Sequence, residues 1–240
     1  MARAKFDSNL LDQALETLRD LLVRHRSLLV SPDVHFLMAT IYERQDRIED
    51  AMATYIEIRD RYPNQPQVPE ALFRLAQATL RSRRPAKEAE ALRIFEALAD
   101  EHSTSVWAER ALMAKGELEE QARLYQRDEV LEISVPRALV TYRSLVEKHP
   151  RGAAAETALW RLGLLYERIK RFDLAAQAFA HLGERYDNTL YDAWFQAAEL
   201  YRERLNRKDL ARAAYARVPP TSRRFEEARE RLVALKSDEP

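Results

Sequence analysis

The chain has 240 residues, which suits one ordinary domain or one array of repeats. The composition predicts an almost wholly helical protein, because 36 alanines and 32 leucines outnumber eleven valines, seven isoleucines and four glycines. The 39 basic and 39 acidic residues cancel, which disfavours nucleic acid or anionic lipid as a partner. Cysteine is absent, which excludes disulfides, thiolate nucleophiles and sulfur-ligated metals.

The first predicted helix runs from Asn9 to Arg26 and has the pattern of the second helix of a helical hairpin, with Ala14, Leu18 and Leu21 on its buried face. Met1 to Phe6 are all that remains of its first helix, so residues 1–30 form half a repeat. Two explanations stay open: the chain is a fragment of a longer protein, which we favour, or this helix caps the array alone.

Five helical hairpins are predicted next in one array, at about residues 32–63, 67–103, 105–150, 153–187 and 190–220, followed by a closing helix at 222–236. Each second helix carries an alanine, and these alanines are Ala14, Ala51, Ala91, Ala138, Ala175 and Ala211, at intervals of 37, 40, 47, 37 and 36 residues. The first helices carry small residues at Ala39, Ala76, Gly116, Gly163 and Ala198. We expect two helices to approach closely at each small residue.

The third hairpin contains about ten extra residues near Leu124. This insertion carries apolar side chains that a stacked repeat does not need: Leu124, Tyr125, Leu131 and Ile133. Two interpretations stay open, because the insertion either packs back on the array or projects as a contact with a partner.

No sequence pattern indicates catalysis. The chain lacks a glycine-rich phosphate loop, a His-Glu-x-x-His pair and a Gly-x-Ser-x-Gly turn. His25, His102 and His149 share one repeat position with Tyr62 and Tyr186, near the ends of second helices, and we interpret it as a packing position. We therefore expect no catalytic residue, no cofactor and no metal site.

A period of about 34 to 37 residues with small and aromatic residues at helical spacing resembles the tetratricopeptide repeat, over almost the whole chain. The resemblance implies an all-α, right-handed superhelical solenoid, in which each hairpin buries its apolar face against the next. Turns such as Tyr62-Pro63-Asn64 and His149-Pro150-Arg151 look like the bacterial cell-envelope subgroup that includes the barrel-assembly lipoprotein and the Tol-Pal coordinator. This resemblance favours a location in the periplasm or cell envelope over one in the cytoplasm.

The resemblance also implies that the first helices line a concave groove. An apolar stripe repeats there once per hairpin, at Phe36, Phe73, Met113, Trp160 and Phe195. Around it lie Thr40, Arg44, Gln77, Arg81, Glu117, Leu164, Arg168, Glu199 and Arg202. The rings either wedge between adjacent first helices as core or face the groove and anchor a segment of a partner.

The expected function is therefore a non-catalytic scaffold or adaptor for protein–protein interaction, as a subunit of a bacterial envelope assembly that binds partner segments in its groove. The alternative is a structural subunit that docks by its convex face or its ends and leaves the groove unused. One or more proteins are the expected partners. We expect neither nucleic acid nor a membrane span, and a lipid anchor only if the chain is a fragment.

Overall fold

The computed structural model describes residues 2–8, 10–24, 31–186 and 191–237. In this part of the chain it contains thirteen α-helices and a single two-stranded sheet, which confirms the prediction of an all-α helical-repeat solenoid. The small β-hairpin is a departure from that prediction. The chain divides into two compact units, residues 1–115 and 116–240.

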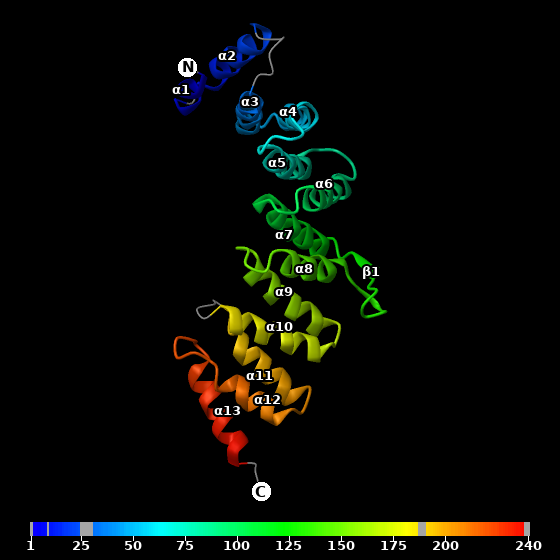
Figure 1. Ribbon diagram of the computed structural model, residues 1–240, viewed down its shortest axis with the longest axis vertical. Helices are drawn as coiled ribbons and strands as arrows, with labels where there is room; N and C mark the ends of the chain where they lie inside the picture. The colour runs from blue at the N-terminus through cyan, green and yellow to red at the C-terminus, as the bar shows by residue number, and fades with distance from the viewer. Residues whose placement is uncertain (1, 9, 25–30, 187–190, 238–240) are drawn as a thin grey trace. The chain divides into compact units, whose positions relative to one another are not determined.

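In the first unit, neighbouring helices in the sequence pair as hairpins (Figure 1). These are α1 (Ala2–Asp7) with α2 (Leu11–Arg24), α3 (Pro32–Arg44) with α4 (Ile48–Arg61), and α5 (Val68–Arg81) with α6 (Lys87–Glu101). The first ten residues of α7 (Val106–Gln121) also belong to this unit. Because α4 packs against both α3 and α5, the apolar face of one hairpin is covered by the next.

The second unit contains the rest of α7, followed by β1 (Tyr125–Arg127), β2 (Ser134–Pro136) and α8 (Arg137–Lys148). Two hairpins come next, α9 (Ala155–Arg168) with α10 (Phe172–Arg185) and α11 (Ala193–Glu203) with α12 (Lys208–Tyr215). The last helix is α13 (Phe225–Ser237), which packs against α12.

The small residues mark close approaches between helices, as predicted. A Cβ atom added to Gly163 would lie 2.4 Å from Cε1 of Phe179, and one added to Gly116 would lie 2.4 Å from Cε1 of Tyr142. Ala51 on α4 is fully buried. At the two glycines the aromatic ring of the second helix therefore occupies the space that a methyl group would need.

The residues that end four second helices are the aromatic and histidine residues noted in the sequence. Tyr62, His102, His149 and Tyr186 each donate the backbone N–H to the carbonyl four residues earlier, at 2.8–3.1 Å. The four residues thus share one position at the helix end, and the packing role of their side chains stays a prediction. His25 lies outside the described residues.

The turns inside four hairpins each contain a left-handed residue that is not glycine: Asp46, Ala86, Lys170 and Asn206, with φ between 50° and 61°. In the turn between α9 and α10, the N–H of Lys170 donates to the carbonyl of Glu167 at 2.9 Å. The left-handed conformation brings Cβ close to a carbonyl oxygen, which glycine would avoid.

Candidate functional site

The aromatic residues of the first helices pack in one way in four hairpins. Each ring contacts a ring of its own second helix, with centroid distances of 5.8 Å for Phe36–Tyr55, 5.7 Å for Phe73–Phe95, 4.9 Å for Trp160–Phe179 and 5.8 Å for Phe195–Tyr215. Each is also contacted from the next hairpin or the closing segment, by Arg74, Trp107, Tyr191 and Arg224 respectively. The rings are thus wedged between successive hairpins.

The stripe residues differ in how much of each side chain stays accessible. Phe195 is 1 % exposed, so its ring is core and offers no surface to a partner. Phe36, Phe73, Met113 and Trp160 are half-buried. We therefore remove Phe195 from the candidate surface and keep the other four as residues with both core contacts and accessible edges.

A tyrosine of the second helix reaches a carboxylate of the first helix. Tyr142 on α8 donates its hydroxyl hydrogen bond to Oε2 of Glu120 on α7 at 3.0 Å, and Nη1 of Arg161 on α9 donates to the same oxygen at 2.8 Å. Nη2 of Arg161 also donates to Glu117 at 3.2 Å. Burial and the neighbouring carboxylate raise the pKa of Tyr142 far above its ordinary range.

The same arrangement recurs in the first unit. Tyr55 on α4 donates to Oε2 of Glu43 on α3 at 3.0 Å, and Nη1 of Arg74 on α5 lies 3.6 Å from that oxygen. Tyr215 on α12 likewise donates to Glu199 on α11. These carboxylates are neutralised inside the chain, so they are poor candidates for binding a basic partner.

Most of the predicted charged groove residues also pair or stack with other residues of the chain. Arg44 stacks over the ring of Phe6 at 3.9 Å, and Nη2 of Arg81 lies 3.1 Å from Asp46. Arg202 donates to Glu199 at 2.8 Å. Three predicted residues remain exposed with neither an ion pair nor a stacking partner in the described chain: Gln77, Leu164 and Arg168.

One open hollow of about 410 Å³ lies on the first-helix side of the first unit. It is lined by Arg3 and Phe6 of α1, Asp33, Phe36, Leu37 and Thr40 of α3, and Gln67 and Glu70 of α5. We call these eight residues the α3 hollow. Two of the predicted groove residues, Phe36 and Thr40, lie in it, and the others do not.

Apolar side chains form part of the α3 hollow and polar groups surround them. Phe36 and Leu37 are half-buried, and the hydroxyl of Thr40 donates to its own helix, to the carbonyl of Phe36 at 2.9 Å. Asp33 accepts a hydrogen bond from Nε2 of Gln67 at 3.0 Å. Among the residues that the structure describes, Asp33 has no basic partner.

The sequence missed the α1 side of this hollow. Phe6 belongs to a helix of six residues, which is too short to show a 3.6-residue period. Phe6 is 8 % exposed, and Arg44 of α3 stacks on its ring, a contact between segments that are far apart in the chain.

The insertion after α7 both packs back and projects. Asp128 is 2 % exposed and Val135 is fully buried, whereas Tyr125 is 59 %, Val130 74 % and Ile133 40 % exposed. The two other predicted contacts, Leu124 and Leu131, are half-buried. The apolar residues of the insertion thus divide between the core and the surface.

Asp128 holds the insertion in place. Its carboxylate accepts the backbone N–H groups of Val130 at 3.0 Å and Leu131 at 2.7 Å, and pairs with Arg143 of α8. Burial alone would raise the pKa of Asp128, but Arg143 and the two amides hold that pKa below its ordinary range.

Within the described ranges, no three His, Asp or Glu side chains come together as metal ligands. The helices there are each too short or too polar to cross a bilayer.

Family models described as tetratricopeptide repeat match residues 1–66, 36–103, 157–189 and 192–219. A tetratricopeptide repeat protein from Parabacteroides merdae is 19 % identical over 86 % of this chain and 73 % of its own, with a TM-score of 0.51. The C-terminal part of a repeat protein of this type from Cytophaga hutchinsonii is 14 % identical over 99 % and 88 %, with a TM-score of 0.56. Pseudomonas aeruginosa pilF is 12 % identical over 96 % and 94 %, with a TM-score of 0.51. No curated protein matches the sequence.

Proposed function

The chain belongs to the tetratricopeptide repeat family, whose members generally mediate protein–protein interactions, and from that membership we propose that it is a non-catalytic scaffold that binds a segment of a partner protein in the α3 hollow. The observation that carries the proposal is that three successive first helices, α1, α3 and α5, contribute side chains to one hollow of about 410 Å³. A segment lying there would contact three hairpins at once.

The chemistry of the α3 hollow favours a segment with an apolar anchor. Phe36 and Leu37 offer accessible apolar surface, and an apolar side chain placed on them would leave water. Asp33 and Arg3 at the same hollow are exposed. Asp33 can accept hydrogen bonds from polar groups beside the anchor, and Arg3 can donate them. This combination of an apolar centre and a polar rim is typical of peptide-binding surfaces.

The proposal is tested with a photo-crosslinking amino acid at Leu37 and, as the control, at Ala53, an exposed residue of the second helix α4. The partner that crosslinks at Leu37 is identified by mass spectrometry, and its segment is titrated calorimetrically against purified variants. Thr40→Arg fills the hollow, and we expect it to weaken binding at least about tenfold, the loss of one good anchor contact. Ala53→Arg is expected to bind like the wild type.

The opposite result would favour the alternative function. If Ala53→Arg weakens binding and Thr40→Arg does not, the partner docks on the second-helix side, and the α3 hollow is not the site. Thermal melts of both variants show whether either effect reflects unfolding.

We also propose that the partner belongs to a bacterial envelope assembly. The support is the sequence of the turns, such as Tyr62-Pro63-Asn64, which resemble those of envelope arrays. Fractionation of cells that express the native gene, followed by immunodetection, tests this. Recovery with a cytoplasmic marker alone would contradict it.

A further inference from the structure

The β-hairpin of the second unit has one strand whose outer edge is open. Its register pairs Gln126 with Val135, and the N–H of Asp128 donates to the carbonyl of Ile133 at 2.9 Å. Backbone hydrogen bonds between antiparallel strands join every second residue pair. The N–H and C=O groups of Tyr125 and Arg127 therefore point away from β2, and no described group bonds to them.

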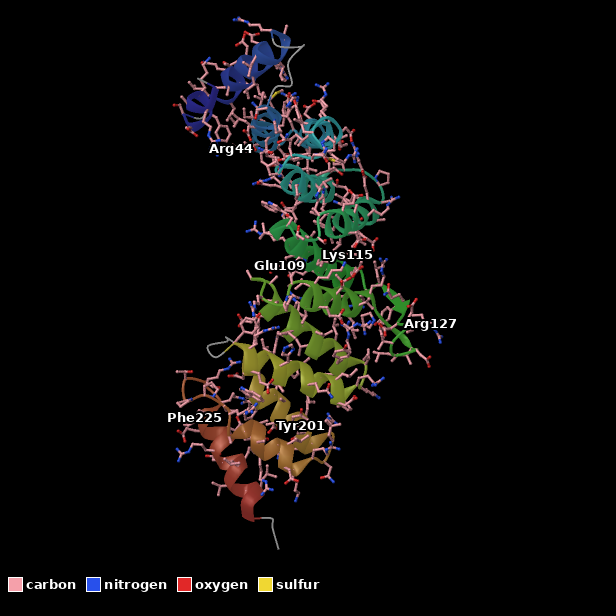
Figure 2. The ribbon with its side chains drawn as sticks, in the orientation of Figure 1. Arg44, Glu109, Lys115, Arg127, Tyr201 and Phe225 are labelled. Carbon is pink, nitrogen blue, oxygen red and sulfur yellow. The ribbon has the colours of Figure 1, made fainter. Side chains whose placement is uncertain are left out.

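The other strand is a poor template for pairing. Pro136 in β2 has no N–H to donate, and β2 runs directly into α8, against which it packs. Figure 1 shows the hairpin projecting beside α8, and Figure 2 shows Arg127 on it. The open edge of β1 is thus the surface through which this hairpin can extend its sheet.

The hairpin is also held ready for pairing. Asp128 fixes the turn through two backbone amides and Arg143, as described above. Tyr125 is 59 % exposed, and Arg127 on the same face is exposed. A preordered strand loses less conformational entropy when it pairs than a disordered one.

We propose that β1 pairs with β1 of a second copy of this chain, antiparallel and centred on Gln126, to give a four-stranded sheet across a two-fold axis. This register brings the outward groups of Tyr125 opposite those of Arg127 of the second copy, and the reverse, which forms four backbone hydrogen bonds. The guanidinium of each Arg127 then lies beside the ring of the opposite Tyr125.

The charges that flank β1 complement each other in the same register. Arg123 precedes the strand in a left-handed turn with φ of 50°, and Glu129 follows it in the next turn, so the two-fold axis brings each Arg123 to the same end of the paired strands as Glu129 of the second copy. Both side chains are exposed, and neither makes an ion pair with a described residue. The self-complementary order of Arg123, Tyr125, Arg127 and Glu129 favours a second copy over an unrelated strand, which would need a matching order of its own.

Charge exchange tests this register directly. Dimerisation of the purified full chain is measured by sedimentation equilibrium between about 5 µM and 1 mM, a range that suits a small, weak interface. Arg123→Glu brings two carboxylates together at each end of the paired strands, and we expect it to weaken the dimer roughly tenfold, because like charges held close together repel at both ends. The double variant Arg123→Glu, Glu129→Arg restores both opposite-charge pairs and should restore the dimer.

Hydrogen exchange identifies the strand that pairs. The amides of Tyr125 and Arg127 should exchange more slowly at the high protein concentration than at the low one, whereas the amide of Gln126, bonded to β2, should be protected at both. Arg127→Pro removes the outward N–H donor and the guanidinium, which serve the dimer and not the hairpin, and should abolish the concentration dependence without lowering the melting temperature of the monomer.

Three results would overturn the proposal. A chain that stays monomeric up to about 1 mM has no such interface at the strength expected of a small one. A dimer that Arg123→Glu leaves unchanged, or that the double variant does not restore, uses another surface. Protection of Tyr125 and Arg127 only in the presence of the partner that crosslinks at Leu37 would show that β1 pairs with that partner instead.

Discussion

Tyr142 and Glu120 are joined by a hydrogen bond of 3.0 Å between the second and first helices of one hairpin, and Arg161 of the next first helix completes the group. The three residues connect two hairpins through a polar contact at the edge of an apolar core. Two hairpins carry phenylalanine in place of this tyrosine: Leu80 stands at the position of Glu120 in the hairpin of Phe95, and Glu167 stands there in the hairpin of Phe179. The polar group of tyrosine, carboxylate and arginine is therefore a feature of some hairpins and not of every repeat.

Removing the hydroxyl should destabilise the second unit. Tyr142→Phe leaves Glu120 with one hydrogen-bond donor fewer, and we expect a loss of about 1–2 kcal/mol in the free energy of unfolding, measured with urea. Tyr201→Phe is the control in the same unit, since the Tyr201 hydroxyl has no hydrogen bond to a described residue. Equal stability of Tyr142→Phe and wild type would show that water replaces the tyrosine at no cost.

The two kinds of stripe residue should respond differently to truncation. Phe195→Ala removes a ring that is 1 % exposed and should cost about 3–5 kcal/mol of stability. Phe36→Ala removes a half-buried ring of the α3 hollow, so it should cost less stability but weaken binding of the partner segment. Urea unfolding and calorimetric titration measure the two quantities. A larger stability loss for Phe36→Ala would contradict the assignment of Phe195 as the deeper core residue.

His35 should make the first unit sensitive to mild acid. Burial lowers the pKa of His35, the carboxylate of Glu57 at 3.5 Å opposes this, and Arg61 supports it. The unfolded chain therefore binds the proton at a higher pH than the folded chain. The stability that the neutral ring provides is present above about pH 6.5 and is lost as the pH falls below it, with a slope of at most about 1.4 kcal/mol per pH unit.

Replacing the ring isolates this contribution. His35→Phe should flatten the decline in melting temperature between pH 7.5 and pH 5, while His181→Gln, at an exposed site, should leave it unchanged. A decline in His35→Phe as steep as in the wild type would assign the acid sensitivity to other groups.

The left-handed turn residues offer a change that should stabilise the protein. Lys170 has φ of 61°, and Lys170→Gly relieves the contact between Cβ and the backbone at the cost of a more flexible unfolded chain. We expect a net gain of about 0.5–1 kcal/mol in urea unfolding. Gln177→Gly, on an exposed position of α10, is the control and should lose about 1 kcal/mol.

The sequence predicted the features that each repeat carries within itself. Gly163 and Phe179 belong to one hairpin, so a small residue and a ring at helical spacing were enough to predict their close approach. The α3 hollow was harder to predict, because Phe6 reaches it from a helix of six residues with no visible period. Of the eight residues of the α3 hollow, the sequence predicted only Phe36 and Thr40 as groove residues, and it could not show which charged groove residues would pair inside the chain.

The insertion itself was predicted, but its two strands were not, for a different reason. Strands of three residues are too short for an alternating pattern to stand out, so Tyr125–Arg127 and Ser134–Pro136 were not expected as strands. The residue that fixes them, Asp128, depends on Arg143, which lies fifteen residues further along the chain. Such a contact exists only after α8 has formed.

The left-handed turns indicate where substitutions can raise the stability of this chain. Asp46 pairs with Arg81 of the next hairpin, and asparagine, as at Asn206, adopts the left-handed conformation with little strain. Ala86 and Lys170 are therefore the two turn positions at which loss of the side chain should relax the backbone. They lie in different hairpins that do not follow each other, so the gains from glycine at these two positions should add. Glycine substitutions at such turns should raise the melting temperature one repeat at a time, without altering the surfaces proposed for its partners.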